Sequence, residues 1–291
     1  MMHKPVLVNE VMENLDIKPG EVVVDTTFGF GGHSKLISEK IGLKGLLIGI
    51  EQDEEVLSQV RDDFQKPNTK LIRANFRDLA SILDGMQISK IDKILFDLGV
   101  ASFHLDESKR GISFKGDEPL DMRLDKSKSV MASDIINEAS EKELADIFYN
   151  FADEYLSRQI AKAIVDRRRK RKFLRTSDLV SEIVKIKGNK HGKTNPATKV
   201  FQALRIAVND EYRAISEGVA AAIEKLNIGG RVAVISFHSG EDRLIKNIFK
   251  SNADVGSIKI ITKKPIVPTR NEIRGNIRSR SAKLRVAERI K

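Results

Sequence analysis

The residues best suited to chemistry begin directly after an apolar, β-branched run. Residues 22–24 are all Val, and the segment 25–34 then reads Asp-Thr-Thr-Phe-Gly-Phe-Gly-Gly-His-Ser. An apolar run that ends in an acid, then a cluster of glycines and a helical pattern, indicates a strand, a tight turn and a helix N-terminus. Glycine has no Cβ, so a ligand can touch the backbone there. The turn is therefore a candidate site for a nucleotide-like cofactor, although a turn that merely connects a strand to a helix would have the same pattern.

The spacing of these glycines narrows the cofactor class. They do not form the Gly-x-Gly-x-x-Gly fingerprint of dinucleotide sites, and no Gly-Lys-Ser/Thr of a phosphate-binding loop follows. The pattern acid-x-x-x-Gly-x-Gly-Gly is closer to the turn that holds S-adenosylmethionine in methyltransferases. That cofactor carries no phosphate, and no Lys or Arg lies between Asp25 and Ser34. An NAD-dependent oxidoreductase is accordingly a poor alternative.

Three further candidates lie at or just after the carboxyl ends of strand-like runs, where ligands bind in parallel sheets. Glu51 could accept both hydroxyls of a ribose, or it could be a surface acid that starts the next helix. Phe76 could lie against an adenine, although a lone Phe is more often part of the core. Asp97 could accept an N–H of an exocyclic base amine and so localise the lone pair for methyl transfer, or it could only cap a turn or bind the cofactor. His238 follows a later strand-like run and is expected at the rim of the same cleft.

The elements that must position these residues alternate between strand and helix. Strand-like runs at 21–25, 46–51, 70–74 and 91–98 are separated by helical patterns, which predicts a parallel sheet covered on both faces. The next clear strand, 231–236, comes more than 130 residues after Asp97, and most of the interval is helical in pattern. We therefore expect an α/β, Rossmann-like domain formed by residues 1–104 and 210–291, with an inserted helical domain at 105–209.

Composition limits the partners. The 291 residues carry a net charge of +10, with an unbroken basic run at 167–172 and eight Lys or Arg against two Glu at 270–291. Two such clusters favour a nucleic-acid partner, although a solvated basic surface is the alternative. The chain has no Cys, which excludes disulfides and thiolate metal sites, and its five His are scattered, so no metal site is expected. Without a signal pattern or an apolar run of about 20 residues, we expect a cytoplasmic protein with no membrane partner.

Taken together, these segments resemble the bacterial 16S ribosomal RNA (cytosine-N4) methyltransferases of the MraW type, the RsmH family. The resemblance spans almost the whole chain and includes Arg-Gly-Ile-Ser-Phe at 110–114, Pro-Leu-Asp-Met-Arg at 119–123 and Ser-Phe-His-Ser at 236–239. The other matching segments are 3–7, 25–34, 97–100, 196–206, 241–243, 280–281 and 284–285. The order of these later blocks makes chance similarity implausible.

The resemblance implies a class I S-adenosylmethionine-dependent methyltransferase sheet with an inserted all-helical substrate-recognition domain. It implies S-adenosyl-L-methionine as donor, and N4 of a cytidine in the decoding centre of 16S rRNA, within the small ribosomal subunit, as acceptor. Dimers occur in the family, although no feature of this sequence demands a homodimer. The cofactor-binding positions that the family implies are Gly31, Gly32, His33, Glu51, Phe76, Asp97 and His104. Glu51 stands where Asp is common in the family, and His104 stands where Gln is common.

Two rival functions stay open on the sequence. Amino-methylation of DNA would suit the isolated sheet motifs, but the Pro-Pro-aromatic tetrad usual in those enzymes does not follow Asp97. A non-catalytic RNA-binding or assembly factor could keep an inert cofactor fold, although the intact glycine turn and acids argue against it. We expect direct transfer to a cytosine drawn out of its stack, with Asp97 as the catalytic candidate.

Overall fold

The computed structural model describes residues 5–114, 116–188 and 195–291, which divide into two compact units. The first unit consists of Met1–Ala101 together with Tyr212–Lys291, and the second of Ser102–Glu211. The chain thus leaves the first unit shortly after Asp97 and returns to it more than 100 residues later. Each unit has its own buried core.

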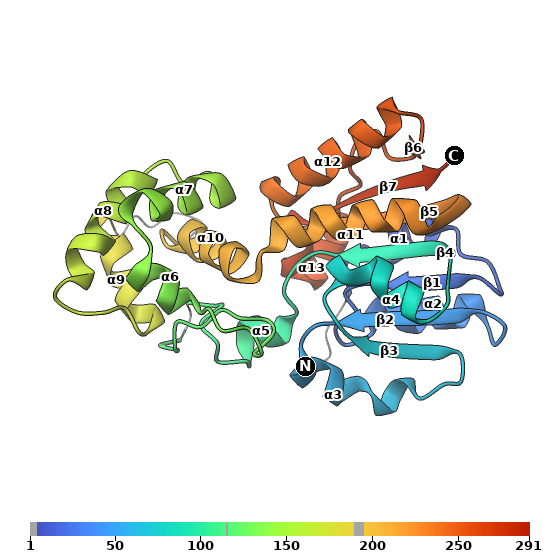
Figure 1. The fold of residues 1–291 in the computed structure, drawn as a ribbon, viewed down its shortest axis with the longest axis horizontal. Helices are drawn as coiled ribbons and strands as arrows, with labels where there is room; N and C mark the ends of the chain where they lie inside the picture. The colour runs from blue at the N-terminus through green and yellow to red at the C-terminus, as the bar shows by residue number, and fades with distance from the viewer. Residues whose placement is uncertain (1–4, 115, 189–194) are drawn as a thin grey trace. The chain divides into compact units, whose positions relative to one another are not determined.

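The first unit is built on a mixed sheet with the strand order β3-β2-β1-β4-β5-β7-β6 (Figure 1). Its strands are β1 (Val22–Asp25), β2 (Leu46–Glu51), β3 (Thr69–Arg73), β4 (Ile91–Asp97), β5 (Leu226–Ser236), β6 (Ile258–Ile260) and β7 (Lys283–Arg289). β1 to β5 are parallel, and β7 runs antiparallel to both β5 and β6. The predicted α/β class is confirmed, although the sheet is mixed and not wholly parallel, because β7 runs antiparallel to its neighbours.

The strand order reverses beside β1, which places a ligand crevice at the carboxyl ends of β1 and β4. β1 pairs on one side with β2, where Asp25 lies opposite Gly49, and on the other with β4, where Asp25 lies opposite Leu95. Asp97, two residues beyond Leu95, therefore ends beside Asp25. The register brings the acids of the first and fourth strands to one edge of the sheet.

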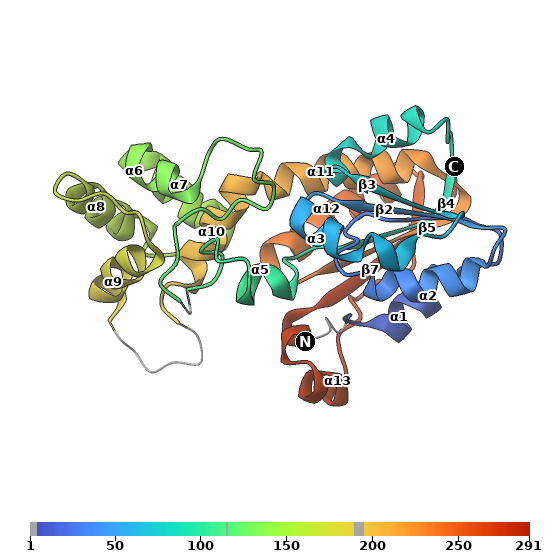
Figure 2. The same ribbon diagram turned by 90° about the horizontal axis from the view of Figure 1, so that it is seen from below.

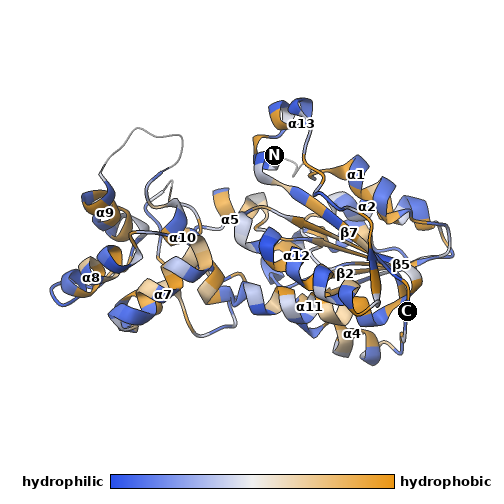
Figure 3. Cartoon of the chain, turned by 90° about the horizontal axis from the view of Figure 1, so that it is seen from above, coloured by the Kyte–Doolittle hydropathy of each residue, from blue (hydrophilic) through white to orange (hydrophobic). Residues whose placement is uncertain are grey.

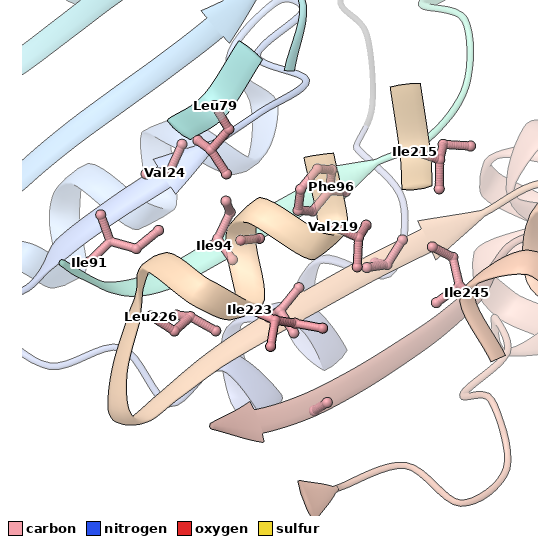
Figure 4. Close-up of a cluster of buried hydrophobic side chains, with 14 of the residues drawn as sticks. Val24, Leu79, Ile91, Ile94, Phe96, Ile215, Val219, Ile223, Leu226 and Ile245 are labelled. Carbon is pink, nitrogen blue, oxygen red and sulfur yellow. The ribbon is translucent and has the colours of Figure 1, made fainter. Parts of the chain in front are cut away.

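Alternate residues of each strand enter different cores, because successive side chains of a strand point to opposite faces. Val24, Ile94 and Phe96 belong to the core on one face of the sheet, drawn in Figure 4, whereas Val23 and Leu95 belong to the core on the other face. Figures 2 and 3 show helices on both faces and hydrophobic strands between them. The helices of this unit are α1 (Val8–Leu15), α2 (Gly32–Ile41), α3 (Glu54–Val60), α4 (Leu79–Gly85), α11 (Glu211–Lys225), α12 (Ser239–Asp254) and α13 (Arg270–Gly275), with 3₁₀ turns η1 (Asp62–Phe64), η2 (Phe76–Asp78) and η3 (Ile277–Ser281).

The second unit is helical. Its helices are α5 (Ser102–Asp106), α6 (Ala132–Glu138), α7 (Glu141–Ala152), α8 (Ser157–Arg168), α9 (Thr176–Lys187) and α10 (Thr198–Asn209). α7 packs against both α8 and α10, with the fully buried Phe148, Ile160 and Leu204 among its core residues. The amphipathic pattern of α7 and α10 accounts for this packing, because each presents one apolar face.

Several family segments form the scaffold of this second unit. Asn209 at the end of α10 donates to the carbonyl of Met122 at 2.8 Å and accepts from the N–H of Leu124 at 2.9 Å. The buried guanidinium of Arg110 donates to the Leu124 carbonyl at 2.9 Å. Asp121 is also paired with Arg123 at 2.7 Å. The polar residues around 119–123 therefore stabilise an irregular loop.

The structure corrects some predicted elements. The helical pattern of the sequence is continuous over 198–225, but Asp210 adopts a left-handed conformation with φ of 54° and separates α10 from α11. The contacts of Asn209 with the loop fix the end of α10 and explain the break. The helices α1, α5 and α13 were not predicted from the sequence. Among the described residues, no helix is long and apolar enough to cross a membrane.

Candidate active site

The glycine turn connects β1 to α2, and its backbone is open to a ligand. Gly29 and Gly31 have positive φ angles of 51° and 72°, which favour glycine. A Cβ on Gly31 would collide with the ring of Phe64, whereas a Cβ on Gly29 would meet only the Thr27 carbonyl, at 3.8 Å. Gly31 is therefore required by packing, and Gly29 leaves unfilled space above the turn.

Glu51, at the end of β2, holds this turn in place. One carboxylate oxygen accepts from the N–H of Gly29 at 3.0 Å, and the other accepts from the N–H of Asp53 at 2.9 Å. The proposed ribose contact stays a prediction. The contact with Gly29 is a second role that the sequence did not indicate.

Asp97 and His33 face each other across the switch point. Nδ1 of His33 lies 3.7 Å from Oδ2 of Asp97, and Nε2 of His33 lies 2.9 Å from the carbonyl of Val6. Because a carbonyl only accepts, Nε2 carries a hydrogen and Nδ1 is left to face the acid. The imidazole is buried, so the Val6 carbonyl sets its tautomer.

Asp97 has unused acceptor capacity. Its backbone N–H donates to the Thr27 hydroxyl at 2.7 Å, and its side chain is only 16% exposed. Oδ1 is buried and has no hydrogen-bond partner among the described residues. A buried polar atom without a partner is costly to leave in a folded protein, and a catalytic role, an ordered water or a bound ligand accounts for such an atom.

Burial raises the pKa of Asp97 from 3.8 to about 6; the nearby His33 opposes this rise, and the charges of Asp25 and Glu241 add to it. At neutral pH the group is therefore a carboxylate, but one that is more basic than an exposed aspartate. Such a group accepts a proton or an N–H readily, and it is complementary to a cationic ligand. A perturbed carboxyl in a crevice is a functional candidate on physical grounds.

Asp25 is a buried acid of a different kind. It accepts from the Ser34 hydroxyl at 2.7 Å and from the Thr27 N–H at 3.3 Å, so it ties the turn to the first turn of α2. Burial also raises its pKa, and the Ser34 hydrogen bond is the main opposing influence. Its bonds are internal to the protein, which makes it part of the scaffold.

The turn between β5 and α12 supports the crevice. His238 caps α12 by accepting from the Glu241 N–H at 3.3 Å, and Glu241 accepts from the Phe237 N–H at 2.7 Å. The Phe237 ring would lie 3.0 Å from a Cβ placed on Gly99. His238 thus acts in capping, and the Ser-Phe-His-Ser segment fixes the backbone next to Asp97.

The remaining candidates are placed differently. Phe76 follows β3 and packs edge-on against Phe96, with ring centroids 5.6 Å apart, so at least part of its ring is a core contact. His104 lies in α5 of the second unit, 5.7 Å from the ring of Phe103. The first unit brings together Gly31, Gly32, His33, Glu51 and Asp97; cofactor contacts of Phe76 and His104 stay predictions.

Sequence reasoning missed Val6 and Thr27, which contact His33 and Asp97. Thr27 lies inside the glycine motif and could have been found there, but no spacing rule connects Val6 to His33. In the parts of the chain that the structure describes, no cluster of three metal-ligating residues occurs. The open turn and the unpartnered oxygen of Asp97 fit S-adenosylmethionine, whose sulfonium is cationic and which has no phosphate.

Comparisons with known proteins place the chain in a family. The proteins named Ribosomal RNA small subunit methyltransferase H of Dictyoglomus thermophilum and Dictyoglomus turgidum are 46% and 45% identical to it, over 99% of this chain and 97% and 98% of theirs. A solved rRNA methylase from Streptococcus thermophilus covers 100% of both chains at 12% identity with a TM-score of 0.45, a likeness too distant to inform on function. The model of the MraW methylase family matches residues 1–290. The chain therefore belongs to the MraW methylase family.

Proposed function

We propose that this protein transfers the methyl group of S-adenosyl-L-methionine to the exocyclic N4 of a cytidine in the decoding centre of 16S rRNA, within the small ribosomal subunit. Family membership over residues 1–290 supports the methyl transfer and the ribosomal RNA substrate. The observation that carries the chemistry is the buried, unpartnered Oδ1 of Asp97 beside an open glycine turn.

The side chains of the crevice have distinct tasks in this mechanism. The bound cofactor supplies an electrophilic methyl group on a sulfonium. Glu51 accepts the ribose hydroxyls, and the backbone at Gly29 to Gly32 lies against the nucleoside. His33, held by the Val6 carbonyl, keeps its Nδ1 3.7 Å from Oδ2 of Asp97.

Asp97 acts on the nucleophile. The lone pair of a cytosine amine is delocalised into the ring, so the amine is a poor nucleophile. By accepting one N–H, the Asp97 carboxylate concentrates electron density on N4 and directs the lone pair toward the methyl group. The same carboxylate, with a pKa raised to about 6, is then suited to receive the proton that N4 loses. The target base has to leave its stack to reach this buried acid.

We assign the second unit to substrate recognition. The last four residues of its basic run, 169–172, are exposed just after α8. Arg171, Lys172 and Arg175 line a pocket of about 290 Å³ with Pro119, Leu174 and Asp178, an acid that is paired with Arg167. Phosphate groups are the ligands that such a cationic hollow favours.

Methylation of purified small subunits with an isotope-labelled donor tests the proposed function. We expect the label in N4-methylcytidine when the RNA is digested to nucleosides and separated by mass. Label on carbon 5, on ribose or on protein would overturn the assignment. Transfer to duplex DNA in place of the subunit would support the rival amino-methylation of DNA.

A further inference from the structure

A stretch of the first unit between β6 and β7 carries an exposed surface of one charge. We call it the α13 basic surface, and it consists of five exposed cations: Lys263, Lys264, Arg270, Arg274 and Arg280. In the described part of the chain, none of the five is joined to an acid by a hydrogen bond or ion pair. Glu272 is the only acid among residues 263–280.

Glu272 is half-buried and anchors the surface to the N-terminal segment. Its Oε1 accepts from the N–H of Leu7 at 2.8 Å, and Thr269 caps α13 by accepting from the N–H of Glu272 at 3.2 Å. The negative charge is therefore used in holding α13 to the N-terminal segment. Further along the chain, Lys283 and Arg285 share Asp242 as a partner, at 3.0 and 2.7 Å, whereas the five cations of the surface have no acidic partner among the described residues.

The surface lies at the same edge of the sheet as the crevice. β7 is antiparallel to β5 and Lys283 is opposite Ser236, so the chain just before β7 lies beyond the carboxyl end of β5. Figures 2 and 3 show α13 at this edge of the sheet. The Leu7 N–H donates a hydrogen bond to Glu272, and the carbonyl of the neighbouring Val6 is hydrogen-bonded to His33. His33 in turn lies 3.7 Å from Asp97. A short series of contacts within one unit thus connects the surface to the candidate catalytic acid.

We infer that the α13 basic surface binds the phosphodiester backbone of the RNA substrate and so places the target nucleotide at the crevice. The inference rests on the proposed function, and it assigns phosphate binding to the catalytic unit itself. Residues 263–280 contain no aromatic side chain, so base stacking has no platform there. Contacts with phosphate position a nucleic acid without reading its sequence, which fits a surface made of charge alone.

The expected size of the effect follows from counterion release. For single-stranded RNA the logarithm of the binding constant falls with the logarithm of salt concentration by about 0.7 for each phosphate contact. At about 0.1 M salt each contact is then worth about a fivefold change in affinity, and three contacts about a hundredfold.

The test compares two triple variants of the full chain that lose the same charge. In the first, Arg270→Gln, Arg274→Gln and Arg280→Gln are combined. In the control, Lys40→Gln, Lys44→Gln and Lys250→Gln remove three exposed cations near the opposite, amino edge of the sheet, at the ends of α2 and α12 and before β2. Binding of a 16S rRNA fragment is measured against salt concentration, and binding of S-adenosylmethionine by calorimetry verifies the fold.

We expect the first triple to lose about a hundredfold in RNA affinity at ~0.1 M salt, with the salt slope reduced by about 2, and the control to lose a few-fold at most. Cofactor affinity should be unchanged in both. Equal losses in the two triples, or full RNA affinity in the first, would overturn the inference. So would a loss confined to the assembled subunit with none on free RNA, which would assign the surface to an acidic protein. A wild-type protein that binds RNA but methylates no cytidine N4 would instead refute the proposed function and leave this comparison standing.

Discussion

Two buried acids at one edge of the sheet behave in opposite ways. Asp25 ends β1 and has its oxygens engaged by Ser34 and Thr27, whereas Asp97 ends β4 and keeps one oxygen without a partner. Burial raises the pKa of both. The comparison teaches that a raised pKa alone does not identify a catalytic acid, because the satisfied group is scaffold. What distinguishes Asp97 is acceptor capacity that the protein leaves open.

The largest effect should follow from Asp97→Asn. The amide keeps the shape but cannot take a proton, so we expect turnover to fall by about 10²- to 10⁴-fold while cofactor affinity changes a few-fold. Single-turnover methylation and calorimetry measure the two quantities. The control is Asp78→Asn at an exposed position in η2. A loss of cofactor binding that matches the loss of turnover would make Asp97 a ligand residue only.

The pH dependence of stability should separate Asp97 from an ordinary surface acid. The folded protein holds the Asp97 proton more tightly than the unfolded chain does, since the pKa rises from 3.8 to about 6. This contribution to stability is complete below about pH 3.8 and is lost as the pH rises through about 6. The loss amounts to about 3 kcal/mol.

Urea unfolding of wild type and Asp97→Asn between pH 4 and pH 7 measures this contribution. We expect the variant to gain on the wild type as the pH increases across that range. A difference between the two proteins that stays constant with pH would mean that the carboxyl titrates normally.

Ser34→Ala would leave Asp25, like Asp97, with a carboxylate oxygen that lacks a hydrogen-bond donor. Removal of the hydroxyl leaves a buried oxygen of Asp25 without its donor, which should cost about 1–3 kcal/mol of unfolding free energy. Ser38→Ala, one turn further along α2, is the control, since the Ser38 hydroxyl only meets Lys66 at 3.2 Å. If the two variants were equally stable, the bond between Ser34 and Asp25 would not support the turn.

The smallest expected change in stability comes from Gly29→Ala. A left-handed φ of 51° costs an alanine about 1 kcal/mol. Gly20→Ala is matched to it, because Gly20 has a φ of 88° and nothing near its missing Cβ. Both variants should lose similar stability, but only Gly29→Ala should weaken S-adenosylmethionine binding. If the two variants bound S-adenosylmethionine with equal affinity, the cofactor would not lie against the turn at Gly29.

Much of the sheet was readable from the sequence because its strands are continuous apolar runs. β2 was predicted with its observed bounds, and Glu51 and Asp97 were placed at strand ends from pattern alone. The break at Asp210 was not predictable, because both flanking segments have helical periodicity and the break depends on Asn209 contacting a loop more than 80 residues away.

The basic run shows a second limit of the sequence. Arg167 donates to Asp178 at 2.7 Å and lies 4.0 Å from the Phe173 ring, and Arg168 donates to the Ile136 carbonyl at 2.8 Å. The neighbouring Arg171 and Lys172 are exposed. Neighbouring basic residues of one run thus have different roles: some form structural contacts and others lie on the surface. The face of the helix on which each one lies and its local partners decide this, and composition does not show either.

The insertion also sets an order of events during synthesis. When β4 emerges from the ribosome, its partner β5 has not been made, because about 130 residues separate the end of β4 from the start of β5. At about 5–20 residues per second, the apolar edge of β4 waits on the order of ten seconds. The helical unit, with its own core, emerges during that delay and can fold first. The newborn chain therefore has to keep a half-built sheet from aggregating until its last quarter is made.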